Sequence, residues 1–375
     1  MEYSIERAKE LVIIAGKMLA KSGLIARTWG NISARISEDK FVVTPSGLAY
    51  ETLTLEQIVL VNIEDCSYEG SIKPSSEKGI HADTYRLRPN VNFIIHTHQV
   101  MASVLSIEGK DIEVHTDKYR RILGETVPCA EYGMSTTNKL RKRVSEVVSN
   151  YPESNALLMK YHGTICMGDS LEHSFEIAMT LEKMAQELYE SVCVANKIQI
   201  VQIPDYGKSW RKGNVFNLEF NGRTSEYRVD GLLEDAPEAA LLHAEIYKSS
   251  NVAYIIHSTD EEIVKVSSKG QILRPLLDDF AQIVGVNIKT VKSGLNNVKD
   301  VAKKLRNKNA VLLENDGALC TGITESDTEA VAMILRKGCL ADLYADALNK
   351  TDRISAVDAY IQRIFYVNKY SKIKK

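Results

Sequence analysis

Apolar side chains recur at helical spacing at the start of the chain and at strand-like spacing after it. Between Ile5 and Lys21 they return every three or four residues, and Gly23 follows, which predicts an amphipathic helix with a glycine stop. The predicted strands and helices alternate along the rest of the chain, which indicates an α/β fold around one sheet. We expect strands at 31–35, 41–44, 58–62, 92–96 and 156–161, and helices at 78–85, 136–150 and 171–194.

One segment of the chain returns later in nearly the same form. His81–Tyr85, followed by an apolar run that ends at His96, recurs 162 residues later as His243–Tyr247, again followed by an apolar run that ends at a histidine, His257. Because segments of mixed α/β proteins can resemble one another by chance, a single match of this kind would be weak.

A second pair of segments follows in the same order. Residues 155–168 recur 154 residues later at 309–322. Two matches in one order predict a tandem duplication of a single fold. We expect the seam after the long helix, which places the domains at 1–197 and 198–375.

The composition narrows the classes of function. The chain of 375 residues has 47 basic and 49 acidic side chains, so it has no basic surplus for a nucleic-acid backbone. No apolar run reaches the ~18–20 residues of a membrane span, and the first residues lack the pattern of a signal peptide. The six cysteines are scattered without a CxxC pair, which is typical of free thiols in a reducing compartment. We therefore expect a soluble, cytoplasmic protein with no nucleic-acid or membrane partner.

Three histidines lie where apolar runs end. His96-Thr97-His98 closes such a run, and because residues i and i+2 of a strand point to the same side, both imidazoles can converge on one point. His162 ends another apolar run and is followed by Gly163, which lets the backbone turn sharply. Three neutral imidazoles with an open fourth position are the ligand set of a catalytic zinc site. The HxH triplet by itself would be a weak signal, because lone histidines are common.

A serine-rich turn lies upstream of the first two histidines. In Lys73-Pro74-Ser75-Ser76-Glu77, the proline fixes the entry to a helix, the serines occupy its N-terminal cap, and Glu77 lies in the first turn. Alone, this pattern is more typical of an ordinary helix cap with a favourable acid. It is also consistent with an anion seat beside which Glu77 accepts a proton. Two more polar turns, Thr28–Asn31 and Thr44–Gly47, are placed to close over the same anion.

The motifs of the first copy follow one another in a specific order. They are Gly30–Arg35, Val43–Gly47, Lys73–Glu77 with His81, Arg88–Val91, His96-Thr97-His98, Val127–Tyr132 and His162-Gly163. In this order they resemble the class II aldolase/adducin family, from about residue 6 to residue 187. The resemblance implies a three-layer α/β/α fold with a central, mainly antiparallel sheet, which is here duplicated.

The resemblance also implies an active site in the first copy. It implies one zinc ion per chain, held by His96, His98 and His162, with Glu77 as catalytic acid/base and as fourth ligand. It implies that Tyr132 reaches a neighbouring subunit's site and handles the proton on the aldehyde oxygen. The residues that would bind the substrate phosphate are Thr28, Asn31, Ser46, Gly47, Ser75 and Ser76.

The activity implied by the resemblance is zinc-dependent aldol cleavage of a phosphorylated ketose, which gives dihydroxyacetone phosphate and a small aldehyde in carbohydrate metabolism. Two alternatives stay open: a pentulose-phosphate 4-epimerase or isomerase on the same metal site, and a non-catalytic scaffold like adducin. Glu77 favours an aldolase, because the family's epimerases carry an aspartate in the same serine-serine motif. The intact histidines argue against a scaffold. Since single-copy relatives form rings, we expect a homo-oligomer, either a dimer that builds a pseudo-tetramer or a tetramer.

The second copy retains little of this motif. His257 matches His96, but the other site positions carry different residues. A zinc ion would be too poorly ligated there, so we expect the C-terminal half to be catalytically empty. In place of His98, His162, Glu77 and Tyr132 it has Thr259, Asp316, Ala239 and Ser293.

A basic run, Lys118-Tyr119-Arg120-Arg121, departs from the smaller, more apolar residues of the family at this place. These cations could recognise an acidic substrate. The same pattern is equally typical of a solvated, basic helix face.

Overall fold

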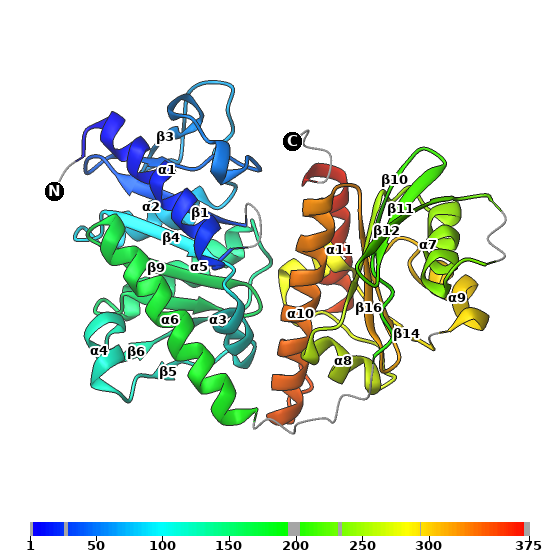
Figure 1. The fold of residues 1–375 in the computed structure, drawn as a ribbon. Coiled ribbons are helices and arrows are strands. Elements are labelled where there is room, and N and C mark those ends of the chain that lie inside the picture. The colour runs from blue at the N-terminus through cyan, green and yellow to red at the C-terminus, as the bar shows by residue number, and fades with distance from the viewer. Residues whose placement is uncertain (1–2, 26–28, 194–202, 232–234, 293, 371–375) are drawn as a thin grey trace. The chain divides into compact units, whose positions relative to one another are not determined.

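The computed structural model describes residues 3–25, 29–193, 203–231, 235–292 and 294–370 (Figure 1). Contacts between residues divide the chain into two compact units, Met1–Cys193 with Val367–Lys375, and Val194–Tyr366. The boundary predicted between residues 197 and 198 lies outside the described residues.

The first unit is built on a seven-stranded sheet in the spatial order β3-β2-β1-β4-β9-β8-β7. Neighbouring strands are antiparallel except β7 and β8, which are parallel, so the predicted mainly antiparallel sheet is confirmed. A separate two-stranded sheet pairs β5 with β6. The strands are β1 (Gly30–Arg35), β2 (Lys40–Val43), β3 (Val59–Asn62), β4 (Phe93–Thr97), β5 (Ile112–Glu113), β6 (Thr126–Val127), β7 (Cys129–Ala130), β8 (Ala156–Met159) and β9 (Gly163–Gly168).

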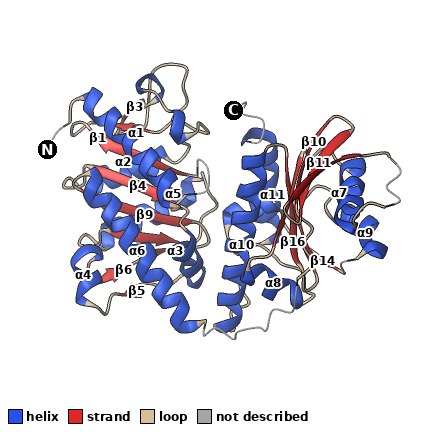
Figure 2. Ribbon diagram, in the orientation of Figure 1, coloured by secondary structure: helices blue, strands red, loops and turns tan. Residues whose placement is uncertain are grey.

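Helices cover both faces of this sheet (Figure 2). They are α1 (Ile5–Ser22), α2 (Lys78–Leu87), α3 (Val100–Leu105), α4 (Asp117–Leu123), α5 (Asn138–Asn150) and α6 (Leu171–Val192). On one face α1, α3 and α6 pack against the central strands, and α4 packs against α6. On the other face α2 and α5 share one buried core with the strands, which includes Ile80, Tyr85, Val144, Phe41 and Ile94.

Side-chain caps set the helix boundaries. In α1, Ser4 Oγ accepts a hydrogen bond from the backbone N–H of Arg7, and the helix ends at Gly23, whose φ of 76° is left-handed. The helix predicted from residue 136 begins instead at Asn138, because Thr137 is its N-cap and accepts from the N–H of Leu140. The strand predicted to run to residue 161 ends at Met159, two residues before Tyr161 takes a positive φ of 64°.

The second unit repeats the sheet topology of the first. Its sheet has the order β12-β11-β10-β13-β16-β15-β14, with one parallel pair, β14 and β15, at the same edge. This identity of strand order confirms the predicted duplication. The strands are β10 (Lys208–Lys212), β11 (Val215–Phe220), β12 (Arg223–Arg228), β13 (Tyr254–Ser258), β14 (Thr290–Val291), β15 (Ala310–Leu313) and β16 (Gly317–Gly322).

The helices of the second unit also lie on both faces of its sheet (Figure 1). They are α7 (Glu238–Ser249), α8 (Glu261–Ser268), α9 (Val298–Lys304), α10 (Glu325–Ala347) and α11 (Ala356–Phe365). α8 and α10 pack against β16, while α7 and α9 contact each other on the opposite side. α11 packs on a turn of π-helix, Phe280–Val284.

Two parts of the first unit have no counterpart among the described residues of the second. No described helix precedes β10 as α1 precedes β1. The long connection between β2 and β3, residues 44–58, is replaced by the two-residue turn Asn221-Gly222, in which both residues have positive φ. The second copy has therefore kept its sheet and lost the turn that carries Ser46 and Gly47.

Candidate metal centre

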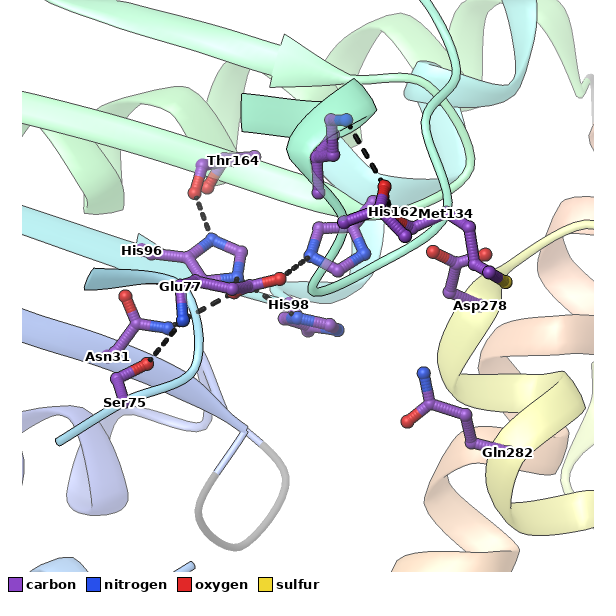
Figure 3. A network of polar contacts seen from close by, with 12 residues as sticks. Asn31, Ser75, Glu77, His96, His98, Met134, His162, Thr164, Asp278 and Gln282 are labelled. Carbon is purple, nitrogen blue, oxygen red and sulfur yellow. Dashed lines mark hydrogen bonds and ion pairs between the residues drawn. The ribbon is translucent and has the colours of Figure 1, made fainter. Parts of the chain in front are cut away.

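Three histidines converge at one end of the first sheet (Figure 3). His96 lies near the end of β4, His98 follows that strand, and His162 lies in the turn between β8 and β9, which is hydrogen-bonded from the N–H of His162 to the carbonyl of Met159. Because β9 is the strand beside β4, this turn comes close to the end of β4. One ring nitrogen from each histidine lies within 4.8 Å of the other two, and the Nε2 atoms of His96 and His98 are 3.2 Å apart.

Gly163 makes this approach of the two strand ends possible. A Cβ atom at this position would clash with the carbonyl oxygen of Thr97 and would lie 3.3 Å from the His96 ring. The glycine after His162 is therefore required by close packing of the turn against β4.

A backbone carbonyl fixes the orientation of the His96 ring. The Nδ1 atom of His96 lies 2.7 Å from the carbonyl oxygen of Thr164. A carbonyl oxygen only accepts, so Nδ1 carries the proton and Nε2 presents its lone pair to the other histidines. A metal-binding histidine is commonly oriented by such a bond.

Glu77 lies between two of the histidines. Its Oε2 atom is 3.2 Å from Nε2 of His96, and its Oε1 atom is 3.3 Å from Nε2 of His162. Burial favours a raised pKa for this carboxyl, but the neighbouring His162 and His96 outweigh burial and hold the pKa of Glu77 well below its usual range. Glu77 is thus held as a carboxylate in a site where it is only 9% exposed.

Glu77 stands one residue earlier in the helix than the sequence predicts. It is the N-cap residue of α2 and not a member of its first turn. Its backbone N–H donates to Oγ of Ser75, and its side chain caps nothing in the helix. The side chain is therefore directed to the histidines and not to the backbone of α2.

Three imidazoles and a carboxylate are ligands of the kind that zinc takes, and three of their separations suit a zinc ion. Ligand atoms about 2.0–2.1 Å from such an ion lie ~3.3 Å from one another. The separations of 3.2 Å between His96 and His98, 3.2 Å between Glu77 and His96, and 3.3 Å between Glu77 and His162 match this spacing. His96, His98, His162 and Glu77 are therefore the residues that could hold the metal.

Two of the loops that carry the predicted phosphate seat pair with each other. The loops 44–47 and 73–77 form an isolated antiparallel bridge between Pro45 and Pro74, with hydrogen bonds from the N–H of Ser46 to the carbonyl of Lys73 and from the N–H of Ser75 to the carbonyl of Thr44. This pairing places the backbone of Ser46 beside the loop that carries Ser75. Asn31 reaches the same end of the sheet through Glu77, while Thr28 lies outside the described residues.

The other predicted residues lie as follows. Tyr132 packs edge-on against Tyr161, the residue before His162, with ring centroids 5.6 Å apart. On α4, Arg120 forms ion pairs with Asp117 and Glu125, which is the arrangement of a solvated helix face.

Our reading of the sequence missed a buried network beside Glu77. Nδ2 of Asn31 donates to Oε2 of Glu77 at 3.2 Å, and Oδ1 of Asn31 contacts Nε2 of His81. Nδ1 of His81 lies 2.6 Å from Oγ of Ser33. Burial, with a smaller contribution from His96, lowers the pKa of His81 to about 3, so the ring is neutral. The signal in the sequence was the repeat itself, since Ser33 and His81 both recur in the second copy, as Ser209 and His243.

The family follows from comparison with known proteins. The family model for the class II aldolase and adducin N-terminal domain matches residues 10–189 and, a second time, residues 209–341. The chain belongs to this family. Members of the class II aldolase/adducin family include aldolases and epimerases of sugar phosphates, as the relatives below illustrate.

Among these relatives, L-fuculose phosphate aldolase of Escherichia coli K12 is 30% identical over 200 residues, which are 53% of this chain and 91% of the relative. A 5-methylthioribulose-1-phosphate/5-deoxyribulose-1-phosphate aldolase of E. coli O45:K1 is 35% identical over 190 residues, 49% of this chain and 85% of the relative. An L-ribulose-5-phosphate 4-epimerase of Salmonella paratyphi C is 28% identical over 193 residues, 48% of this chain and 84% of the relative.

Among solved structures, an L-fuculose 1-phosphate aldolase matches 53% of this chain and 91% of its own, with 27% identity and a TM-score of 0.46. These relatives and this structure correspond in length to about half of the duplicated chain. Within the described residues, no helix combines the length and apolar character needed to cross a membrane.

In the described part of the second match, the one retained site histidine is bonded to the backbone. His257 accepts a hydrogen bond at Nδ1 from the N–H of Tyr206, and its Nε2 atom lies 2.6 Å from the carbonyl oxygen of Asp316. Both ring nitrogens of His257 are therefore bonded to backbone. Across the described parts of both units, the group of His96, His98 and His162 is the one set of three His, Cys, Asp or Glu side chains close enough to hold a metal.

Proposed function

We propose that the N-terminal copy, residues 1–197, is a zinc-dependent aldolase that cleaves a phosphorylated ketose to dihydroxyacetone phosphate and a small aldehyde in cytoplasmic carbohydrate metabolism. The observation that carries the proposal is the Glu77 carboxylate held 3.2 and 3.3 Å from Nε2 of His96 and His162. Relatives with 30–35% identity that are named as aldolases of 1-phosphorylated ketoses support it.

In this proposal His96, His98 and His162 hold one zinc ion per chain, with Glu77 as a fourth ligand when no substrate is bound. A bound zinc ion supplies a Lewis acid that stabilises negative charge developing on a substrate carbonyl oxygen. The fixed Nδ1–H tautomer of His96 keeps its Nε2 lone pair directed to the metal position.

The protein groups then divide the proton transfers. In the direction of condensation, Glu77, a buried carboxylate beside His96 and His162, removes the C3 proton of dihydroxyacetone phosphate. Tyr132 protonates the new alkoxide, in the site of a neighbouring subunit of a homo-oligomer. The phosphate group is bound by Thr28, Asn31, Ser46, Gly47, Ser75 and Ser76.

The test is the variant Glu77→Gln. Because Gln keeps the size and one oxygen of the side chain and cannot accept the proton, we expect the protein to retain zinc and bind dihydroxyacetone phosphate but to lose exchange of its C3 proton with D2O. Glu172→Gln, on the exposed side of α6, is the control and should exchange at the wild-type rate. Exchange at the wild-type rate in Glu77→Gln would refute the assigned role.

A 4-epimerase is the second candidate, because a ribulose-phosphate epimerase is among the relatives. Product analysis with fuculose 1-phosphate, rhamnulose 1-phosphate and ribulose 5-phosphate separates the two reactions. The C-terminal copy, residues 198–375, is proposed to be non-catalytic and to serve the assembly.

A further inference from the structure

A line of buried hydrogen bonds runs from the core of the first unit to Glu77. The hydroxyl of Tyr85 lies 2.7 Å from Oγ of Ser33, which lies 2.6 Å from Nδ1 of His81. Nε2 of His81 contacts Oδ1 of Asn31, and Nδ2 of Asn31 lies 3.2 Å from Oε2 of Glu77. None of the five side chains is more than 9% exposed.

Chemistry assigns a direction to every bond of this line. A carboxylate only accepts, so Asn31 turns its NH2 group to Glu77 and its oxygen to His81. Nε2 of His81 must then carry the proton, which leaves Nδ1 to accept from the Ser33 hydroxyl. The Ser33 oxygen in turn accepts from Tyr85. Every donor meets an acceptor, and the reverse order would place the Asn31 oxygen against the Glu77 carboxylate.

The second copy contains the same hydrogen bonds among tyrosine, serine and histidine but no counterpart of Asn31 or Glu77. Oγ of Ser209 lies 2.7 Å from both Nδ1 of His243 and the hydroxyl of Tyr247. Gly207 takes the place of Asn31, since it bonds to His257 as Asn31 pairs with His96. Within the described residues, the buried Nε2 atom of His243 meets no hydrogen-bonding atom.

This difference separates two roles. In the second copy the hydrogen bonds of Ser209 to His243 and Tyr247 join β10 to α7. Because no group of metal-binding side chains lies beside them in the described residues, we assign this part of the network to packing in both copies. The bond from the histidine to an asparagine is present only where a glutamate faces the metal ligands.

We propose that His81 is a positioning residue, which as its Nε2–H tautomer holds the Asn31 amide so that Asn31 in turn holds Glu77 between His96 and His162. The expected effect of His81 on catalysis rests on the proposed aldolase function. The orientation of Asn31 is independent of that function and can be measured separately.

The experiment compares two leucine variants of the full-length protein. His81→Leu and His243→Leu each remove a fully buried imidazole and its bond to a serine, so their effects on folding are matched. Only His81→Leu removes the link to Asn31. His81→Gln keeps an N–H donor in that direction and serves as the rescue.

The kinetic measurement is exchange of the C3 proton of dihydroxyacetone phosphate with D2O. We expect the maximal rate to fall about 10- to 100-fold in His81→Leu, the range typical for loss of a group that orients a ligand, with KM changed less than about twofold. His81→Gln should recover most of the rate, and His243→Leu should retain it. An equal loss in both leucine variants, or none in His81→Leu, would overturn the proposal.

The second measurement does not depend on activity. In zinc-free, 15N-labelled protein, the side-chain amide of Asn31, assigned by its loss in Asn31→Ala, should shift in His81→Leu and stay unchanged in His243→Leu. An unchanged Asn31 resonance in His81→Leu would overturn the positioning role. If the wild-type protein does not exchange the proton at all, the aldolase proposal fails, and this resonance alone decides the role of His81.

Discussion

His96 and His257 stand at the same place in the two sheets but present opposite ring nitrogens to a backbone carbonyl. His96 pairs with Ile165 across β9, as His257 pairs with Leu319 across β16. His96 donates from Nδ1 to Thr164, whereas His257 donates from Nε2, to Asp316. The retained histidine of the second copy has thus become a structural residue, and only His96 keeps a nitrogen for a metal ion.

The metal should be bound in the first copy alone. We expect the purified protein to contain about one zinc ion per chain, since only one site offers three imidazoles. Plasma mass spectrometry should find the metal lost in His96→Ala and retained in His257→Ala. Two zinc ions per wild-type chain would show that our reading of the second copy is wrong.

Gly163 and Gly317, the first residues of β9 and β16, hold corresponding positions, but only Gly317 has a positive φ, of 87°, which adds backbone strain to an alanine there. In Gly163→Ala the new Cβ would clash with the carbonyl of Thr97, and in Gly317→Ala with the carbonyl of Ser258. Each should destabilise its unit by about 1–3 kcal/mol, as overpacking does. Only Gly163→Ala should also weaken zinc binding, because it displaces His162 from β4. Titration with a zinc indicator measures this, and equal zinc affinity in both variants would contradict it.

Removing one partner of a buried ion pair should destabilise the second unit strongly. Nζ of Lys337 lies 2.8 Å from Oδ2 of Asp279, and both side chains are at most 2% exposed. Lys337→Met leaves a buried carboxylate without its cation, so the free energy of unfolding should fall by about 3–5 kcal/mol. Urea titration followed by the fluorescence of Trp210, in a Trp29→Phe background, measures it.

The control for this pair is a surface one. Lys208 lies 3.2 Å from Glu219, and both side chains are 46% exposed, so Lys208→Met should cost less than about 1 kcal/mol. The double variant Lys337→Met with Asp279→Leu should be more stable than Lys337→Met alone. A single variant as stable as the double one would argue against an uncompensated charge.

Acid should destabilise the second unit through His243. Burial, with a contribution from His257, lowers the pKa of His243 to about 3 from an ordinary value of 6.5. The unfolded chain therefore binds a proton that the folded one does not, and stability present above pH 6.5 is lost as the pH falls towards 3. The slope for one histidine is about 1.4 kcal/mol per pH unit.

The variant His243→Leu isolates this effect. Between about pH 6 and about pH 5, it should lose ~1 kcal/mol less free energy of unfolding than the wild type. Urea titrations at the two pH values, read at Trp210, give the difference. Equal losses in both proteins would mean that His243 is protonated in the folded state.

Local sequence patterns predicted much of the fold. The repeated segments around His81 and His243 predicted the duplication because each repeats a buried helix and strand, whose apolar spacing is readable from the chain alone. The three metal-site histidines could also be predicted from the sequence, since each lies at the end of an apolar run. The site residue that was missed, His81, acts through Asn31, which is 50 residues away, and no local pattern reports that contact.

Other features were out of reach for similar reasons. The ring orientation of His257 depends on the backbone of Asp316 and Tyr206, which a sequence does not place. The N-cap position of Glu77, which was expected in the first turn of α2, depends on its side chain turning to the histidines. In both cases a tertiary contact decides between local alternatives of similar energy.

The turn Asn221-Gly222 makes the loss of the second site a one-way step in evolution. Histidines and a glutamate can return by single substitutions, but the segment that corresponds to residues 44–58 is gone and would have to be inserted again. The two-residue turn leaves no backbone on which a counterpart of Ser46 and Gly47 could be placed. Restoring the histidines and the glutamate by substitution would therefore give the second copy metal ligands without this part of the predicted phosphate seat.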